Sequence, residues 1–392
     1  MCRLTCYAGR TMTALTTLSE EERLLSESVL GFARERVAPH VARMDEEEKL
    51  DPSLVPGLFE MGLMGIEIPE EYGGAGGSFM NAILAVEALG RVDASLAVVV
   101  DVQNTLVDNA VLRWGNTEQK KRYLPKLASS WVGSYALSEQ GSGSDAFALA
   151  ARAERRPGGW QLTGRKLWIT NAAEASLFIV LANVDPSQGY RGITAFLVER
   201  DFRGFEVGKK ENKLGIRASS TCELILEGCQ VPDENVLGEV GKGFNLGQRW
   251  LTIHDRLLRG PYSLGKMQRA LDMSIEWAKQ RVTFDKPIAE RQAIQWKLVD
   301  MYTDICALRA LMFEVAARAD AGEDVRAEAA MVKMLASDWG TRCLDHAIQI
   351  HGAMGESTEL PLTHFYRYIR HFQIGGGTNE IQRTLITRKL LR

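Results

Sequence analysis

Residues 135–170 read YALSEQGSGSDAFALAARAERRPGGWQLTGRKLWIT, and this stretch decides the central part of the fold. It begins with a strand-like run that ends in Ala136 and continues into the loop 140–145, where glycine and serine alternate. A second strand is predicted over 164–170, after a Pro-Gly-Gly turn at 157–159. The pattern therefore predicts strands around a polar loop.

The loop and the second strand together favour a ligand site. Glycine and serine leave backbone N–H groups open to a polar ligand, because neither side chain is bulky. Trp168 lies among aliphatic neighbours, and the two strands carry hydroxyl groups at Ser138 and Thr170. This combination suits a flat heteroaromatic ring, which needs one apolar wall and a few hydrogen bonds at its edge. A plain β-hairpin with a flexible loop is the alternative that these residues leave open.

The chain before this stretch, from residue 18 to 131, has the apolar spacing of helices. Ser19 precedes three glutamates, which is typical of a helix N-terminus, and Pro39 is predicted to end the first helix. Further helices are predicted over 54–64, 79–89 and 93–110. The last of these carries charge only at three aspartates, among them Asp101, so we expect it to be buried on nearly all sides.

The spacing of apolar residues changes near residue 132. Short apolar or β-branched segments bounded by turn residues follow at 177–182, 192–198 and 223–226. Strands at this spacing indicate an antiparallel barrel or sandwich, and the helical spacing after residue 241 indicates a bundle. The predicted fold is of the α+β multidomain class, with a disordered leader (1–17), an N-terminal helical domain (18–131), a central antiparallel β-barrel domain (132–240) and a C-terminal four-helix bundle (241–392).

The composition excludes several classes of function. A net charge of -3 over 392 residues gives no basic surface for nucleic acid. The six cysteines contain no Cys-x-x-Cys pair and the six histidines have no metal-binding spacing, so we expect neither a metal nor a disulfide scaffold. No apolar run reaches the roughly 18 residues that a membrane span needs.

The cysteine usage also fits a reducing compartment. The first nineteen residues contain arginine, serine and threonine but no acid, as in a short organelle presequence. The expected location is the cytoplasm, or the mitochondrial matrix if the source is eukaryotic.

Several dispersed motifs have the order and spacing of a known family. They are GLMGIE at 62–67, VDAS at 92–95, QNTL at 103–106, NVDP at 183–186 and ENKLGIRASSTC at 211–222. Each of these motifs would be weak evidence on its own. With the helical, β, helical order they closely resemble the acyl-CoA dehydrogenase family from residue 18 to 391, and its short/branched-chain branch most of all over the first 240 residues.

The resemblance implies FAD bound between the β domain and the C-terminal bundle, with contacts from two subunits and hence a homotetramer. The residues implied around the flavin ring are Tyr135, Leu137, Ser138, Gly143, Ser144, Trp168, Ile169 and Thr170. The other implied flavin contacts are Arg281, Thr283, Phe284, Gln292, Gln349, Gly352, Ala353, Thr378 and Glu380. An arginine facing phosphate is physically expected, although a solvated helix end is the alternative role for Arg281.

The resemblance also implies an acyl-CoA substrate and electron-transfer flavoprotein as the electron acceptor, docking near Trp168. The residues that match substrate or CoA contacts are Ser144, Tyr190, Phe244, Arg256 and Gly377. The implied reaction is α,β-dehydrogenation of the thioester to a 2-enoyl-CoA. A carboxylate removes the α-proton while the β-hydride goes to the flavin.

Such a proton is too weakly acidic for a free carboxylate, so hydrogen-bond donors must polarise the thioester carbonyl. The family implies the backbone N–H of Gly376 as one donor. Many members carry the catalytic glutamate at this position, whereas the isovaleryl and long-chain members take it from a Glu-Arg pair on an earlier helix. Asp255 and Arg256 align with that pair, so Asp255 is the predicted base, with Glu380 and His254 in reserve. A surface acid is the alternative role for Asp255.

Two other functions are compatible with the same residues. One is an oxygen-using flavoenzyme, such as an acyl-CoA oxidase or a nitroalkane-oxidase-like enzyme, in which an aspartate base is also plausible. The other is a flavin-binding homologue without turnover, suggested by the glycine at residue 376.

Overall fold

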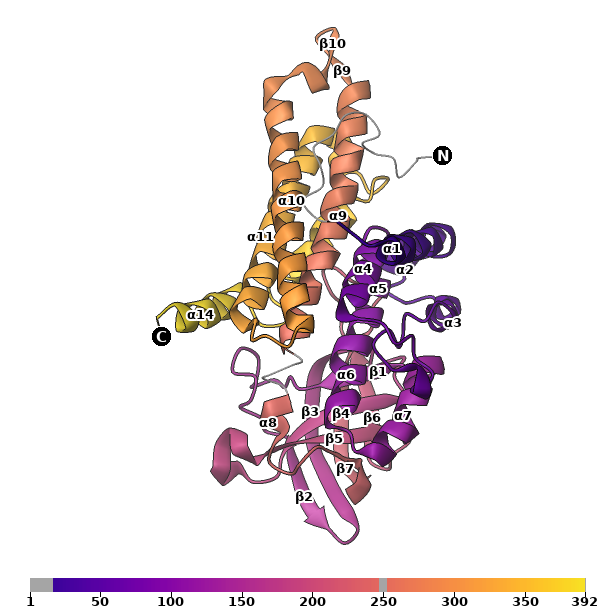
Figure 1. Cartoon of the computed structure of the whole chain (residues 1–392), viewed down its shortest axis with the longest axis vertical. Coiled ribbons are helices and arrows are strands. Elements are labelled where there is room, and N and C mark those ends of the chain that lie inside the picture. The colour runs from indigo at the N-terminus through magenta and orange to yellow at the C-terminus, as the bar shows by residue number, and fades with distance from the viewer. Residues whose placement is uncertain (1–16, 247–251, 392) are drawn as a thin grey trace.

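The computed structural model describes residues 17–246 and 252–391. The leader expected over 1–17 lies outside the described residues except for Thr17. Figure 1 shows an elongated molecule in which long helices stand above a region of strands, with the N-terminal helices beside both. The predicted order of helical, β and helical regions is confirmed.

The first helix, α1 (Glu20–Phe32), begins as predicted. The Ser19 hydroxyl accepts from the N–H of Glu22, and the Glu22 side chain accepts from the N–H of Ser19. The helical path does not end at Pro39, however. A π-helical segment (Ala33–Val37) and a 3-10 turn (Ala38–His40) lead into α2 (Val41–Glu46). Pro39 occupies the start of the 3-10 turn, where its missing N–H is not needed.

The helix predicted over 54–64 is shorter, because α3 (Val55–Glu60) stops before Gly62, whose φ is 69°. The predicted apolar helices are present and buried. They are α4 (Phe79–Gly90), α5 (Ala94–Asp101), a π-helical segment (Val102–Asp108) and α6 (Asn109–Trp114), and α7 (Thr117–Ser129) follows. A π-helical segment inside a helical run often occurs at a functional site.

The central sheet contains eight strands. They are β1 (Gly133–Ala136), β2 (Arg152–Arg156), β3 (Gly159–Thr170), β4 (Leu177–Asn183), β5 (Ile193–Glu199), β6 (Phe205–Lys210), β7 (Thr221–Pro232) and β8 (Val236–Leu237). The order is β6-β7-β3-β2-β4-β5-β8, and β1 pairs with β4.

The sheet differs in detail from the predicted antiparallel barrel. Within the described residues its ends, β6 and β8, do not pair, so the sheet is not closed. The pairing of β1 with β4 is parallel, and so is the single contact of β2 with β4. Hairpin turns predict local antiparallel pairs, whereas these parallel pairs join strands that are distant in sequence.

The C-terminal region is a helical bundle. It consists of α8 (Gly243–Leu246), α9 (Thr252–Gln280), the hairpin β9 (Val282–Thr283) and β10 (Lys286–Pro287), α10 (Gln292–Asp320), α11 (Arg326–His351), α12 (Ala353–Glu356), α13 (Leu362–His371) and α14 (Asn379–Leu390). Helices α9, α10 and α11 pack side by side, and α13 and α14 pack on α11.

Buried side chains of all three regions form one connected apolar cluster. Elements from each region are therefore held in fixed positions where the regions meet. Within 17–246 and 252–391, no helix is both long and apolar enough to cross a membrane.

Candidate active site

A cavity of about 680 Å³ lies where the sheet, the π-helical segment, the start of α9 and the loop between α13 and α14 meet. Many of the predicted site residues line it. These are Tyr135, Leu137, Ser138, Gly143, Ser144, Trp168, Ile169, Thr170, Tyr190, Phe244, Asp255, Arg256 and Gly377. Residues from both the β domain and the bundle thus surround one space, as the flavin prediction requires.

The β-domain side of the cavity offers an aromatic wall and free hydroxyl groups. Trp168 has a φ of 62° at an irregularity between β3 and β7, and its side chain is 58% exposed. The hydroxyls of Ser138 and Thr170 make no hydrogen bond within the described part of the chain. These groups are available to a flat ring with polar edges, so this wall fits the isoalloxazine of FAD.

A buried ion pair anchors the loop that forms this wall. Lys166 Nζ lies 2.6 Å from Glu139 Oε1 and donates to the carbonyl of Leu137 at 3.1 Å. Glu139 also accepts from the backbone N–H groups of Ala150 and Ala151. Burial lowers the pKa of Lys166 to about 8, against the opposing charge of Glu139. The residues just before the glycine-serine loop and the backbone at 150–151 after it are therefore held to β3 through Glu139 and Lys166.

Asp255 is buried in the first turn of α9. Its Oδ1 accepts from Arg259, which is one turn along the same helix. Its Oδ2 lies 2.7 Å from the position that a Cβ atom on Gly376 would take, so the carboxylate touches the glycine loop. Burial, together with the nearby charge of Asp255, raises the pKa of Tyr135, which lies on β1 across the cavity.

Arg259 bridges Asp255 to a second buried carboxylate, that of Asp101. Arg259 Nη1 lies 3.4 Å from Asp101 Oδ2, and Tyr262 and Thr105 each donate to the Asp101 carboxylate at 2.7 Å. Burial raises the pKa of Asp101 to about 6, while the charge of Arg259 acts in the opposite direction.

Asp101 and Arg259 are not among the residues predicted for the site from the sequence. Two signals could have found them. Asp101 is one of only three charges in an apolar helix, and Asp255 and Arg259 are four residues apart, which places them on one helix face. The contact between α5 and α9 brings Asp101 together with Asp255 and Arg259.

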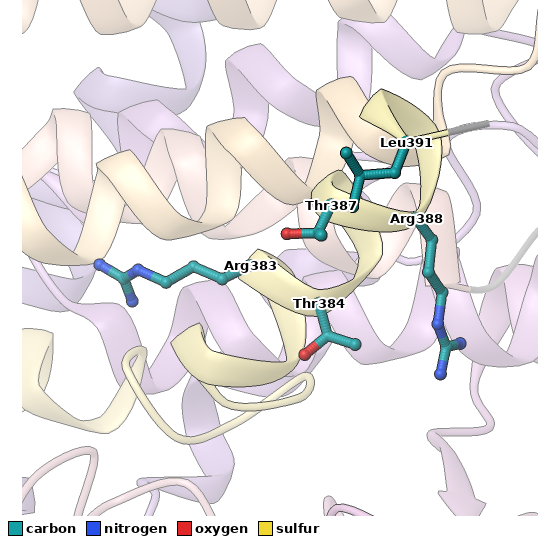
Figure 2. A pocket seen from close by; sticks show the side chains of 5 residues that line it. All are labelled: Arg383, Thr384, Thr387, Arg388 and Leu391. Carbon is teal, nitrogen blue, oxygen red and sulfur yellow. The ribbon is translucent and has the colours of Figure 1, made fainter.

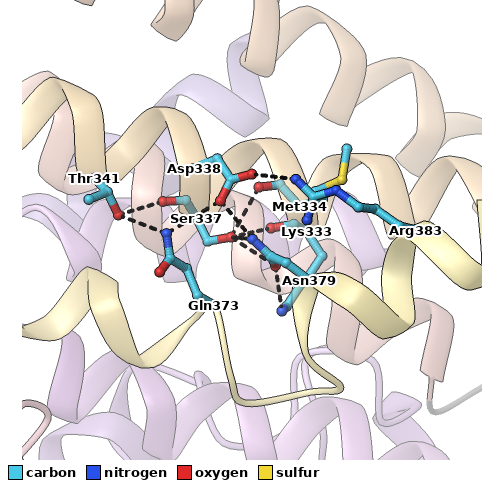
Figure 3. Close-up of polar contacts among 8 residues, drawn as sticks. All are labelled: Lys333, Met334, Ser337, Asp338, Thr341, Gln373, Asn379 and Arg383. Atoms are coloured by element: carbon cyan, nitrogen blue, oxygen red, sulfur yellow. Dashed lines mark hydrogen bonds and ion pairs between the residues drawn. The ribbon is translucent and has the colours of Figure 1, made fainter.

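The loop that carries Gly376 is clamped onto α11 at both ends (Figure 3). Gln373 donates to Asp338 at 3.3 Å, and Asn379 donates to the same Asp338 oxygen at 2.8 Å. The N–H of Asn379 also donates to the carbonyl of Gln373 at 3.0 Å. Lys333 Nζ, which is fully buried, donates to Asn379 Oδ1 at 2.9 Å. These contacts fix where the loop passes Asp255.

Inside the loop the carbonyl groups are engaged and two N–H groups are open. Gln382 donates to the carbonyls of Gly376 and Gly377 at 3.1 and 2.7 Å. The N–H groups of these glycines have no acceptor among the described residues. The predicted donor at Gly376 is therefore free to bind a carbonyl oxygen beside the Asp255 carboxylate.

The two reserve bases lie outside the lining of the cavity. Glu380 is exposed in the first turn of α14, just after Thr378, whose hydroxyl accepts from the N–H of Ile381 at 3.4 Å. His254 is buried against Phe79, with ring centroids 4.2 Å apart. Of the three candidate bases, only Asp255 reaches the cavity.

Of the other predicted flavin contacts, Thr378 and Glu380 lie at the start of α14, and the rest lie at the opposite end of the bundle, near the β9–β10 hairpin (Figure 1). The latter are Arg281, Thr283, Phe284, Gln292, Gln349, Gly352 and Ala353. The stacked rings of Trp277 and His351, 5.2 Å apart, hold the ends of α9 and α11 together there. Phe284 is 90% exposed at the tip of the hairpin. The structure thus separates the predicted flavin residues into two groups.

A second hollow, of about 490 Å³, lies along α14 (Figure 2). Its lining consists of Arg383, Thr384, Thr387, Arg388 and Leu391. Thr384 and Arg388, one turn apart, also line the cavity described above, so the hollow adjoins its rim.

Three family models match the chain in order. The acyl-CoA dehydrogenase N-terminal domain matches residues 19–130, the middle domain 134–229 and the C-terminal domain 241–391. The chain belongs to the acyl-CoA dehydrogenase family. A probable short/branched chain specific acyl-CoA dehydrogenase of Dictyostelium discoideum is 46% identical over 379 residues, covering 96% of this chain and 92% of that protein. The predicted family, fold and enzyme class, that of FAD-dependent oxidoreductases, are confirmed.

Two solved structures of the acyl-CoA dehydrogenase fold support this family assignment. The butyryl-CoA dehydrogenase of Megasphaera elsdenii is 35% identical with a TM-score of 0.94, and the match covers 96% of this chain and all of that chain. A prolyl acyl carrier protein oxidase is 30% identical with a TM-score of 0.90, covering 95% of this chain and all of that chain.

Proposed function

We propose that this acyl-CoA dehydrogenase family member oxidises a short or branched acyl-CoA to the 2-enoyl-CoA, with Asp255 as the base. The observation that carries the proposal is the position of the Asp255 carboxylate, inside the cavity and against Gly376. FAD bound in the cavity would accept the hydride that leaves the β-carbon of the substrate. The predicted flavin and substrate residues keep their roles as part of this proposal.

The chain's own residues supply the proton step. The Gly376 N–H is open beside Asp255, so a thioester carbonyl bound there would have its α-carbon near the carboxylate. Donation to the carbonyl oxygen stabilises the negative charge that develops as Asp255 removes the α-proton. Phe147, Tyr190 and Phe244 form an aromatic cluster at the rim, with centroids 4.6 and 4.5 Å apart, and this cluster limits the entry of water.

The acceptor and the assembly are further parts of the proposal. Exposed Trp168 offers an apolar surface next to the ring site, which supports docking of electron-transfer flavoprotein there. Phe284, Trp296 and Val299 are 90%, 60% and 59% exposed on the hairpin and α10, which supports burial between subunits of a homotetramer. The proposed location is the cytoplasm, or the mitochondrial matrix if the source is eukaryotic.

Substitution of the base tests the function. The holoenzyme is mixed anaerobically with butyryl-CoA and 2-methylbutyryl-CoA, and the flavin absorbance is followed. The wild type should bleach, whereas Asp255→Asn should retain FAD and bleach at least on the order of 100-fold more slowly, because it lacks the proton acceptor. Full activity of Asp255→Asn would refute the assignment, and Asp233→Asn, which changes an exposed pair with Arg155 outside the cavity lining, serves as the matched control.

The same experiment separates the alternatives. Hydrogen peroxide formation in air, without an added acceptor, would indicate an oxygen-using enzyme. An unchanged flavin spectrum with a broad acyl-CoA panel would indicate a flavin-binding homologue without turnover.

A further inference from the structure

We propose that Arg259 and Asp101 are positioning residues for the base: Arg259 holds the Asp255 carboxylate against Gly376, and Asp101 balances the charge of Arg259. The inference rests on the proposed role of Asp255 and adds two residues to the same proton step. It begins from the observation that the base does not stand alone but is the outer member of a carboxylate–guanidinium–carboxylate triad.

The triad joins two elements that face the cavity. Asp255 and Arg259 lie on one face of α9, and Asp101 is the last residue of α5, immediately before the π-helical segment. Asp101 is fully buried and Arg259 is 7% exposed, so water does not compensate these charges. The guanidinium lies 5.9 Å from the ring centroids of both Tyr262 and Phe372. With these walls, Arg259 is held in one position and fixes the Asp255 oxygen that it contacts.

A single arginine next to a base would oppose catalysis. A nearby cation favours the charged form of a carboxylate and so makes it a weaker acceptor of protons. The second carboxylate removes this conflict, because Asp101 and Arg259 together carry no net charge. The triad as a whole then carries the one negative charge that the α-proton would neutralise. Arg259 can therefore orient Asp255 while the triad keeps a single net negative charge.

The contacts of Asp101 suit the charged form of that carboxylate. Tyr262 and Thr105 donate to its two oxygens, each at 2.7 Å. Burial raises the pKa of Asp101 to about 6, so above that pH it carries the balancing charge. Although burial opposes its charge, the carboxylates of Asp255 and Asp101 raise the pKa of Arg259, which stays protonated throughout.

Other charged or titratable groups also face the triad. They are Arg256 and Tyr262 on α9, Tyr135 on β1, Lys333 on α11 and His371 on α13. His371 is exposed at the end of α13. Burial is the main cause that lowers the pKa of Lys333 to about 7, and the positive charge of Arg259 is the second cause. None of these groups lies between Arg259 and its two carboxylates, and the loop residues 375–377 are all glycine.

The test isolates proton transfer from hydride transfer. The holoenzyme is reduced with dithionite, so that it cannot accept a hydride, and is incubated with butyryl-CoA in D₂O. Exchange of the α-hydrogens is followed by NMR across a range of pH, with saturating butyryl-CoA. FAD content and thermal unfolding are measured for every variant.

Two substitutions should shift the acid limb of the exchange profile in opposite directions. Asp101→Asn leaves the Arg259 charge unbalanced, which favours ionised Asp255, so the limb should move to lower pH and the plateau rate should fall. Arg259→Gln leaves two buried carboxylates close together, which disfavours ionised Asp255, so the limb should move to higher pH. Each shift should be on the order of one pH unit. Arg259→Lys keeps the charge and should return the limb towards its wild-type position.

Shifts in the same direction, or lower rates with no shift, would overturn the proposal, since a purely structural role predicts lost stability alone. Where a charge-changing variant loses FAD, Tyr262→Phe provides the test. It removes one hydrogen bond to ionised Asp101, so the acid limb should move to lower pH, as in Asp101→Asn, but by a smaller amount. An acid limb that does not move would contradict the proposal. Arg309→Gln, which breaks a remote pair with Glu87, is the matched control and should leave the limb unchanged.

Failure of the proposed function is distinguishable from failure of this inference. If Asp255→Asn still exchanges the α-hydrogens at the wild-type rate, Asp255 is not the base. If Asp255→Asn is inactive while neither Asp101→Asn nor Arg259→Gln moves the limb, the base is supported and the positioning role is wrong.

Discussion

The Asp255 carboxylate and the Gly376 backbone occupy adjoining space: Asp255 Oδ2 lies 2.7 Å from the position of a Cβ on Gly376. Real Cβ atoms do not approach an oxygen this closely, and Gly376 has a φ of 70°, which other residues rarely adopt. In this arrangement a side chain at residue 376 and the Asp255 carboxylate exclude each other. Because residue 376 has no side chain, the aspartate side chain reaches the loop, although it is shorter than that of a glutamate.

Gly376→Ala should therefore displace Asp255 from the loop. We expect flavin reduction by butyryl-CoA to slow by on the order of 100-fold, because a shift of about 1 Å at a reacting group has this effect. Gly322→Ala is the matched control, since Gly322 also has a positive φ, of 81°, but a Cβ there meets no atom within 4 Å. It should lose some stability and keep its reduction rate. Equal rates for the two variants would contradict the exclusion.

Lys166→Met should weaken flavin binding more than the same substitution at an exposed lysine does. It leaves Glu139 as a buried charge without its cation, which costs about 3–5 kcal/mol in the free energy of unfolding. The loop at the cavity wall should loosen, and FAD should dissociate at a lower urea concentration. Lys209→Met is the control, because Lys209 is exposed and its pair with partly buried Glu211 should contribute less than about 1 kcal/mol. Denaturant titration with flavin fluorescence compares them, and equal midpoints would count against the anchor.

Asn379→Ala should release the loop that carries Gly376 (Figure 3). Removing the amide leaves buried Lys333 without its acceptor, at a cost of about 1–3 kcal/mol. We expect faster hydrogen–deuterium exchange across residues 374–378 and slower flavin reduction. Arg383→Ala, which removes a more exposed contact to Asp338, is the control. If only Arg383→Ala increased the exchange, the clamp would not depend on Asn379.

Lys266 should make stability depend on pH. Its side chain is fully buried, donates to the carbonyl of Gly90 at 3.2 Å, and has its pKa lowered by burial to about 7. The unfolded chain keeps that proton to about pH 10.4, so between these values it binds more protons than the folded state. This residue's contribution to stability therefore rises with pH from about 7 to 10.4.

Lys266→Met removes this dependence. The Tm of the variant should exceed that of the wild type by the largest amount near pH 7, and this difference in Tm should shrink as the pH approaches 10. Calorimetry at a fixed scan rate measures it. A difference in Tm that is constant from pH 7 to 10 would show that the buried amine does not titrate as proposed.

Local patterns predicted much of the fold. The Ser19 cap, the buried run 93–110 and the Pro-Gly-Gly turn between β2 and β3 all occur as expected, because each depends on neighbours in sequence. The end of the first helix at Pro39 was wrong, since a proline is tolerated where its N–H is not required. Parallel pairing of β1 with β4 carries no local signal and could not be predicted from turns.

The sequence by itself determined which chemical groups the protein has: a glycine-serine loop and Trp168, a run of three glycines at 375–377, and an aspartate, Asp255, on an earlier helix. Only the tertiary structure decided how Asp255 is used, because Gly376, Arg259 and Asp101 meet it through contacts between distant segments. Periodicity and spacing record which face of an element is buried, whereas the charge that surrounds a buried carboxylate depends on which elements pack against it.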